Sequence, residues 1–599
     1  MIGAANKAGI VERGLFVVLV ACTFFYVCLR AVHVPFTHDE AVSFFQYART
    51  GAFQPGFAHW DAGNHLLSSA FGHLAYLGFG MSPGAIRTGS VLCYLLYAFY
   101  VWRVRSWALN ALVRNVIGIT LLLTPFLLDF FSLFRGYGPS VAFALMGMYH
   151  LVRYSVQRTR PHLVWGVIAF SLAGLASLNI LLFWMQALGL FALFAVIHVV
   201  PLRTKAMHLS ILALLGLPPL GYSIWYGEEL KLRNMLYYGS DEGLVKGTLA
   251  SLSRLVLGSD PWPLLVSIGL LMVLAMTVAF ASLNKGAAQD ERWMPLRILA
   301  LCLLGELVGR TLLWELKGVL YPIDRTASHL VLFSLLLFAL ALDRMAMRTS
   351  IIGYAVLVLL VLPIRTMKGL NLERTVLWPE EHFDEKLFAA FQERRSRSER
   401  PLLVSVWNQY DIPWLYAREL AHPELGPVTT EGYPLPQADL VLLSALHTKR
   451  PKGYEVIYKS EDTLVQLLER REPLQLELIG DTAISILDGT GSFFDLWTLP
   501  VARAGGRPLI VELSLHLTTK GKDPVFQLVS DAKRADGATI MYEALDLHRV
   551  HQQWNADTLH MVRHFPAITA PDWAKLYLWM INGRALEGDC RIRTYRVSN

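Results

Sequence analysis

Two adjacent acids, Asp39 and Glu40, give the chain its clearest potential for chemistry. They follow His38 just after a long apolar run, and they begin a stretch, 41–48, whose apolar residues have helical spacing. A carboxylate in this position can act as a general base and remove the proton from an attacking hydroxyl. An acid at the start of a helix can also simply cap it, favoured by the helix dipole. Read alone, the pair leaves both explanations open.

A second polar cluster ends the same loop. Residues 60–65 read WDAGNH and stand directly before another apolar stretch. The segment between the two clusters reads as a helix lying on a membrane surface. Two polar clusters that bracket such a helix indicate a pocket rather than a cap alone. Asn64 and His65 are therefore candidate binding residues.

Four arginines lie in or beside apolar segments. A charge in hydrocarbon is costly, so such a residue is expected to face a cavity or a partner. Arg310 has Glu306 four residues earlier, a spacing that predicts a structural ion pair. Arg135 and Arg325 stand at the ends of apolar segments, where they either snorkel to the surface or bind a phosphate at headgroup depth. Arg87 is the fourth candidate.

The composition places these residues in a membrane protein. Of the 599 residues, 54% are hydrophobic and 17% are charged, whereas soluble domains carry roughly 25% charged residues. The apolar residues crowd into positions 1–366, which excludes a single soluble globule and a fibrous, disordered or disulfide-built protein. No cysteine or histidine spacing suggests zinc. The net charge of +7 gives no indication of nucleic-acid binding.

Twelve apolar segments are candidate membrane helices. Their lengths are close to the roughly 20 residues that a membrane span needs. Basic clusters predict which loops are cytoplasmic. They fit about eleven crossings, with one of the first two segments after the 34–63 loop not crossing as a full span. The N-terminus is then inside and the C-terminal part outside. The segments are 14–33, 64–80, 86–104, 111–129, 136–154, 162–180, 181–200, 206–226, 262–283, 298–316, 326–342 and 350–366.

This topology predicts four polar stations on one side of the membrane. Two of them are the loop that carries residues 38–40 and the loop 227–261. The other two are short turns next to predicted spans. They contain Asp129 with Arg135, and Tyr321 with Asp324 and Arg325.

Five sequence pieces, in order, resemble the polytopic glycosyltransferases of the GT-C class. The similarity covers about residues 10–345 and is greatest to bacterial family 39-like members, which are related to protein O-mannosyltransferases and to the lipid A aminoarabinose transferase. The family often has Asn-Asn-His where this chain has Gly63-Asn64-His65, so a role of the first Asn does not transfer. The pieces are THDEA, WDAGNHLLSS, SPGAIRTGSVL, DFFSLFRGYGPS and YPIDRTA.

The resemblance implies that a sugar moves from a polyprenyl-phosphate carrier to an acceptor hydroxyl on the non-cytoplasmic side of the cell's inner (cytoplasmic) membrane. The catalytic acid of that class maps onto Asp39, with Glu40 as its neighbour. The leaving phosphate needs a cation, which Arg135, Arg325 or His65 would supply. Some members of the class use a divalent metal ion, but two adjacent acids are too few ligands to assign one here.

The implied enzyme is a hexosyl- or pentosyltransferase, with membrane lipids, a lipid-linked donor and a glycan, lipid or protein acceptor as partners. Two alternatives stay open: a transporter or flippase for a lipid-linked or anionic solute, and an inactive glycan-binding scaffold. The gathering of polar residues on one face favours the enzyme. Its candidate site joins catalytic Asp39 and Glu40 with binding residues His38, Asn64, His65, Arg87, Asp129, Arg135, Tyr321, Asp324 and Arg325.

Two soluble domains are predicted after the multi-pass domain, 1–366. Strands over 402–407, 438–446 and 454–460, with a helix over 411–421, predict a small α/β domain at 370–470. Short alternating strands over 473–599 predict an antiparallel, jelly-roll-like β-sandwich. Such sandwiches often bind carbohydrate. Four tryptophans are available to stack on a sugar, although most are expected in the core: Trp497, Trp554, Trp573 and Trp579.

Overall fold

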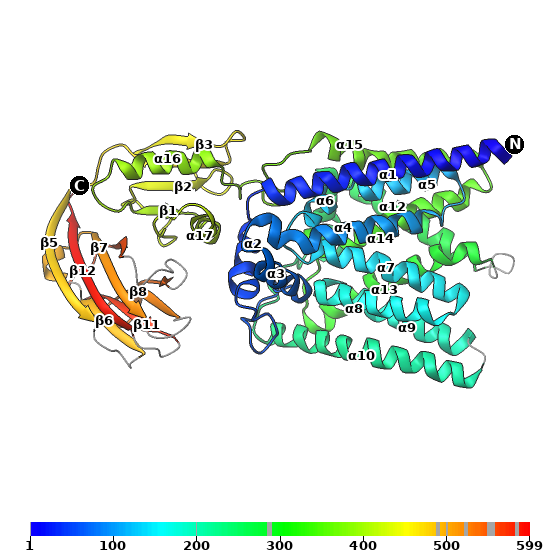
Figure 1. Cartoon of the computed structure of the whole chain (residues 1–599), viewed down its shortest axis with the longest axis horizontal. Coiled ribbons are helices and arrows are strands. Elements are labelled where there is room, and N and C mark those ends of the chain that lie inside the picture. Colours follow the sequence, from blue (N-terminus) through cyan, green and yellow to red (C-terminus); the bar gives the residue numbers. More distant parts are fainter. Residues whose placement is uncertain are drawn as a thin grey trace. The chain divides into compact units, whose positions relative to one another are not determined.

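In the computed structural model the chain folds into two compact units, each held together by its own internal contacts (Figure 1). The helical unit contains Met1–Val34 and Val42–Leu377. The β-rich unit contains Pro35–Ala41 and Trp378–Asn599. A short segment early in the chain therefore belongs with the C-terminal part. The structure describes residues 2–198, 201–283, 290–423, 425–486, 492–498, 501–519, 525–547, 558–581 and 586–598.

The helical unit has a helix at each of the twelve predicted apolar segments, which Figure 1 shows as a bundle of long helices. Short helices α2 (His38–Ser43) and η1 (Phe44–Ala48) follow the first one. The others are α1 (Ile2–His33), α3 (Leu66–Phe79), α4 (Pro83–Arg105), α5 (Ala111–Leu122), α6 (Pro125–Phe131), α7 (Tyr137–Gln157), α8 (Arg160–Ala176), α9 (Leu181–His198), α10 (Leu202–Leu232), α11 (Ala250–Leu257), α12 (Trp262–Ala281), α13 (Met294–Lys317), α14 (Ser328–Ala346), η6 (Ser350–Leu360) and α15 (Val361–Lys368).

Seven helices of the described residues are long and apolar enough to cross a membrane, or eight if α5 and α6, bent by 51°, form one span. Helices α7 and α13, with 21 and 24 residues, fall outside this count. Helix α3 has 14 residues, a length of about 21 Å against a hydrocarbon thickness of about 30 Å. The polytopic helical fold is confirmed, and the eleven crossings stay a prediction.

Local sequence explains the bend between α5 and α6. Proline has no N–H to donate and disfavours a helical conformation in the residue before it. Pro125 begins α6, and Thr124 before it is extended, with ψ 123°. Helix α5 therefore ends at Leu122, and a new helix starts in a different direction.

The ion pair predicted from helical spacing is present in α13. Nε of Arg310 lies 2.9 Å from Oε1 of Glu306, and Nε2 of His329 lies 3.2 Å from the same oxygen. All three side chains are buried. Neutralising charges inside the bundle is what allows them to lie at this depth.

The first sheet of the β-rich unit has the order β1-β2-β4-β3. The predicted strands are confirmed as β1 (Val404–Val406), β2 (Leu440–Ser444) and β3 (Tyr454–Lys459), and the predicted helix is α17 (Asp411–Leu420). Strand β4 (Val465–Arg470), which the sequence analysis did not identify, pairs with both β2 and β3. Helix α16 (Glu385–Ser396) begins where the Asp384 side chain accepts a hydrogen bond from Leu387 N.

Two further four-stranded sheets, both antiparallel, form the predicted β-sandwich. Their orders are β10-β7-β12-β5 and β6-β11-β8-β9, and alternate residues of both face one apolar core. A second cluster joins this sandwich to the first sheet. The strands are β5 (Leu476–Ile486), β6 (Phe493–Thr498), β7 (Leu509–Thr519), β8 (Phe526–Lys533), β9 (Thr539–Asp546), β10 (Leu559–Phe565), β11 (Trp573–Met580) and β12 (Leu586–Val597).

The tryptophans of the sandwich have different environments. Trp497 is partly buried and packs on the core. Trp579 stacks on the exposed ring of Phe493, with ring centroids 5.8 Å apart, and Trp573 lies beside Lys533 and Lys575. The fourth, Trp554, lies outside the described residues.

A glycine at the start of α7 yields a stability prediction. An added Cβ on Gly136 would lie 1.8 Å from the carbonyl oxygen of Ala176 and 2.6 Å from Cγ of His65. We expect Gly136→Ala to destabilise the protein by about 1–3 kcal/mol or more, because backbone must move to relieve the contact. The control is Gly189→Ala in α9, where nothing lies within 4 Å and alanine should stabilise slightly. Thermal unfolding in detergent measures both, and equal midpoints would contradict the prediction.

Candidate functional site

The THDE sequence forms a capping box at the start of α2. Oε2 of Glu40 accepts hydrogen bonds from the backbone N and the Oγ1 of Thr37, at 3.1 and 3.2 Å. A threonine followed three residues later by glutamate is the typical sequence of this motif. Glu40 is fully buried. The capping role that the sequence analysis considered for Asp39 is therefore filled by Glu40, and Asp39 stands half-buried in the first turn.

Residues of the β-rich unit hold the segment that carries these acids. The backbone N of His38 donates to Oε2 of Glu381 at 2.7 Å, and its Nδ1 lies 3.2 Å from the carbonyl oxygen of Gln409. The same nitrogen is 3.9 Å from Oδ1 of Asp411. These contacts give His38 a positioning role beside Asp39.

Asn64 fixes the loop that precedes α3. Its Nδ2 donates to the carbonyl oxygen of Phe53 at 2.9 Å, and its Oδ1 accepts from Oγ of Ser69 at 3.0 Å. Both ends of the buried amide thus bind the protein itself. His65, the next residue, lies with its ring 4.8 Å from the ring of Tyr137 in an edge-on arrangement.

Arg135 binds the end of α2 and lies close to Gly63. Its Nη1 donates to Oγ of Ser43, the last residue of α2, at 2.9 Å. An added Cβ on Gly63 would lie 3.7 Å from Nη2 of Arg135 and 3.2 Å from Oδ1 of Asp61. The glycine that departs from the family pattern thus leaves room beside this arginine and acid. The Arg135 guanidinium also lies 5.9 Å from the centre of the Tyr137 ring.

A tyrosine that the sequence analysis missed connects Asp324 with Arg325. The hydroxyl of Tyr238 donates to Oδ2 of Asp324 at 3.1 Å and accepts from Nη1 of Arg325 at 2.9 Å. The guanidinium also lies over the tyrosine ring, 4.0 Å from its centre. Burial raises the pKa of Tyr238, and the positive charge of Arg325 opposes that rise. The hydroxyl is therefore neutral near pH 7.

Backbone pairing holds this group in place. The N–H of Ser240 donates to the carbonyl oxygen of Tyr321 at 3.0 Å, and the N–H of Tyr321 donates back at 2.9 Å. Tyr321 is buried, with its ring 5.7 Å from that of Trp314. An added Cβ on Gly239 would lie 2.5 Å from Cβ of Leu320, so glycine permits this close approach.

Two predicted binding residues make strong contacts with the protein itself. Asp129 forms a buried ion pair with Arg30 and accepts a hydrogen bond from the backbone N of Val376. Arg87 is fully buried. Its Nη1 donates to the carbonyl oxygens of Ala31 and Val34, at 3.1 and 2.6 Å, where α1 ends. Both residues thus have a structural role in the bundle.

Tyr137 contacts the first of the two arginines of the helical unit. It packs against His65 and Arg135, and its proximity contributes to the raised pKa of Tyr238. Nothing in the sequence spacing signalled Tyr238.

The described residues contain no group of three or more His, Cys, Asp or Glu side chains that could hold a metal ion. Asp39 and Glu40 are adjacent in the sequence, but their side chains have different surroundings. The Glu40 carboxylate is bound to Thr37.

No protein-family model and no curated protein matches the chain. The solved structures that are similar to it include the following three. ArnT from Cupriavidus metallidurans, bound to undecaprenyl phosphate, is 14% identical, with 76% of this chain and 97% of ArnT covered and a TM-score of 0.37. The Archaeoglobus fulgidus oligosaccharyltransferase, with Zn and sulfate, is 11% identical, with 68% and 62% covered and a TM-score of 0.37. The mycobacterial arabinofuranosyltransferase AftD is 11% identical, with 98% and 59% covered and a TM-score of 0.40.

The chain thus spans about 62% of the length of the archaeal enzyme. The three similarities are low, at 11–14% identity and TM-scores of 0.37–0.40.

Proposed function

We propose that the protein is an integral membrane glycosyltransferase that moves a sugar from a polyprenyl-phosphate donor to an acceptor hydroxyl. The observation that carries this proposal is that two arginines of the helical unit each lie against a tyrosine ring, Arg135 against Tyr137 and Arg325 against Tyr238. A planar guanidinium binds two phosphate oxygens at once. Two of them suit a phosphate that gains negative charge as it leaves.

Asp39 is the proposed general base. The acceptor oxygen attacks the anomeric carbon, its proton passes to the Asp39 carboxylate, and the bond to the donor phosphate breaks. Direct displacement inverts the configuration at the transferred sugar. We assign the base to Asp39 and not to Glu40, since Asp39 is half-buried whereas Glu40 is fully buried and bound to Thr37.

Arg135 and Arg325 are the proposed donor ligands. Arg325 follows Pro322 in the turn before α14, and Arg135 precedes α7. Residues at span ends lie near the depth of lipid headgroups, where a carrier phosphate stays while its polyprenyl tail remains in hydrocarbon. Such groups act electrostatically, because they are in place before charge develops on the phosphate. A divalent metal ion is not assigned.

The activity is tested with the purified full chain and a panel of polyprenyl-phosphate sugars. Release of the free carrier phosphate is followed with and without candidate glycan, lipid and protein acceptors. Release that depends on one sugar donor supports the proposal. Absence of release with every donor and acceptor would contradict it.

We expect Asp39→Asn to lower the transfer rate by about 10²–10⁴, because only proton acceptance is lost. Glu40→Gln is the matched control, and its effect should fall on stability, by about 0.5–2 kcal/mol through the weakened cap. Transfer rates and thermal midpoints are measured for both variants. Full activity of Asp39→Asn would end the general-base assignment, and a larger rate loss in Glu40→Gln would move the role to that residue.

Arg325→Ala should raise the KM for the donor by about 10- to 100-fold, the loss expected for a hydrogen bond to a charged group. Arg325→Lys should recover part of this loss, because lysine keeps the charge but not the planar fork. Tyr238→Phe should have a smaller effect of the same kind. Donor kinetics are compared with the exposed control Arg292→Ala. Wild-type saturation in both Arg325→Ala and Arg135→Ala would remove the arginines from the phosphate site.

We place the first loop and the soluble residues on the same, non-cytoplasmic side of the inner membrane, because the basic clusters fit that orientation. Single cysteines replace Phe57 and Lys452, with Thr159 as the reporter for the opposite side, in a chain that lacks its own cysteines. All three positions are exposed. A membrane-impermeant thiol reagent on intact cells should label the first two only. Labelling of Phe57→Cys without Lys452→Cys would contradict this topology.

A further inference from the structure

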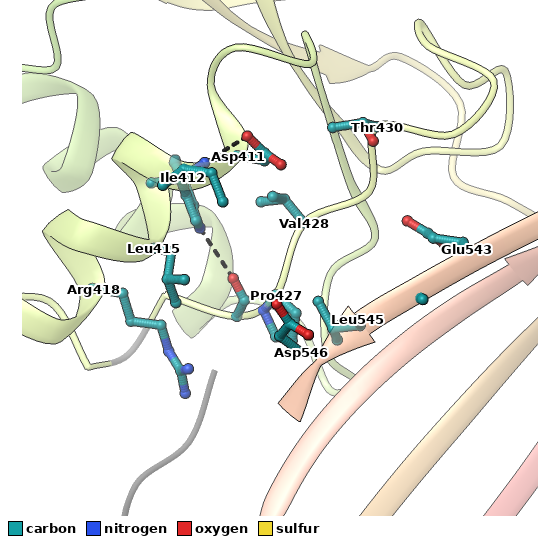
Figure 2. A pocket seen from close by; sticks show the side chains of 13 residues that line it. Asp411, Ile412, Leu415, Arg418, Pro427, Val428, Thr430, Glu543, Leu545 and Asp546 are labelled. Carbon is teal, nitrogen blue, oxygen red and sulfur yellow. Dashed lines mark hydrogen bonds between the residues drawn. The ribbon is translucent and has the colours of Figure 1, made fainter. Parts of the chain in front are cut away.

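A cavity of about 190 Å³ lies within the β-rich unit, between α17 and β9. Figure 2 shows side chains of α17 on one side and side chains of β9 on the other, with the segment 426–430 between them. The cavity is smaller than the roughly 300–1,000 Å³ of sites for drug-sized ligands. Its size suits one ring of a larger molecule.

The walls of the cavity are fixed by bonds around it. Nε1 of Trp414 donates to the carbonyl oxygen of Gly426 at 3.0 Å. Oγ1 of Thr429 donates to Oε1 of Glu543 at 2.7 Å, and the other oxygen of Glu543 lies 2.6 Å from Nη2 of Arg563. A cavity whose walls are already held in place binds without a large ordering cost.

The lining combines hydrogen-bonding groups with apolar side chains. Asp411, Glu543 and Asp546 contribute carboxylates, and Arg418 contributes a guanidinium. Burial raises the pKa of Asp411 and lowers that of Arg418. Nε of Arg418 is buried and has no hydrogen-bond partner among the residues that the structure describes. The apolar part of the lining consists of Ile412, Leu415, Pro427, Val428 and Leu545.

These groups match a neutral sugar ring. Carboxylates accept hydrogen bonds from hydroxyls, a guanidinium donates to hydroxyl or ring oxygens, and the C–H face of a sugar packs on apolar side chains. Counted with Arg563, which pairs with Glu543, three carboxylates face two arginines, and this excess of negative charge disfavours an anion. The polar lining disfavours a purely apolar ligand.

The cavity also adjoins the segment that carries the proposed base. Asp411 lines the cavity, and its Oδ1 is 3.9 Å from Nδ1 of His38, the residue before Asp39. This neighbourhood lies within one unit of the chain. A sugar held against Asp411 would thus be bound beside the start of α2.

We propose that this cavity binds one neutral sugar residue of the acceptor, which makes the acceptor a glycan. The role of this sugar as part of the acceptor rests on the proposed glycosyltransferase function. The existence of a sugar-binding site depends only on the cavity. The bound residue is a recognition point of the acceptor chain, and the hydroxyl that receives the new sugar belongs to another residue of the same chain.

The test uses the full chain in detergent with the Asp39→Asn change, so that binding is measured without transfer. Isothermal titration and saturation-transfer NMR follow the binding of mannobiose, arabinobiose and cellobiose, with digalacturonate as the anionic probe. We expect a neutral disaccharide to bind and digalacturonate to bind at least tenfold more weakly. Failure of every neutral probe to bind, or tighter binding of digalacturonate, would overturn the proposal.

Two variants locate the site. Ile412→Trp fills the cavity, and Arg418→Met keeps the length of the side chain but removes its donors. Each should weaken disaccharide binding at least tenfold, whereas Leu420→Trp, at an exposed position of the same helix, should not. Unchanged far-UV circular dichroism and thermal midpoints exclude misfolding. Wild-type affinity in both cavity variants would overturn the assignment of the site.

A kinetic experiment separates this proposal from the proposed function. In a chain with Asp39 intact, Ile412→Trp should raise the KM for a glycan acceptor and leave the KM for the donor unchanged. Sugar binding that is lost in Ile412→Trp, together with no transfer from any donor, would overturn the transferase function and leave the sugar site standing. Transfer with an unchanged acceptor KM would overturn the acceptor role of the cavity.

Discussion

Hydrocarbon offers a guanidinium no hydrogen-bond partner, and the helical unit is organised around this constraint. Arg30 of α1 is fully buried. It meets Asp129 and the backbone carbonyls of Asn371 and Arg374, which follow the last helix of the unit. One buried charge therefore ties the first helix to the turn at α6 and to the segment after α15.

The adjacent acids show how helix geometry separates two roles. Consecutive side chains on a helix point about 100° apart, so neighbours in sequence face different surroundings. Glu40 turns back to Thr37 and closes the first turn. Asp39 occupies the adjacent direction and stays half-buried. A cap supplied by one acid allows the other to serve a different purpose, and the order of the two residues decides which is which.

Much of the fold was predictable, because apolar length and strand alternation are local signals. The twelve helices and most strands follow from them. The sequence also contained the Thr37–Glu40 capping box, a local pattern that was not recognised. The ion pair of Asp129 with Arg30 was not predicted, because the two residues lie 99 positions apart and no local signal links them. Tyr238 was missed for the same reason, since its partners Asp324 and Arg325 come from a distant turn.

The membership of Pro35–Ala41 in the β-rich unit has a consequence for how such chains can diversify. Phe36 stacks on Tyr416 with ring centroids 4.1 Å apart, and His38 binds Glu381 and Gln409. The C-terminal part, Trp378–Asn599, is thus not an independent module that recombination can replace by a simple fusion after the last helix. A successful chimaera must exchange Pro35–Ala41 together with Trp378–Asn599. We therefore expect these two segments to change together during evolution.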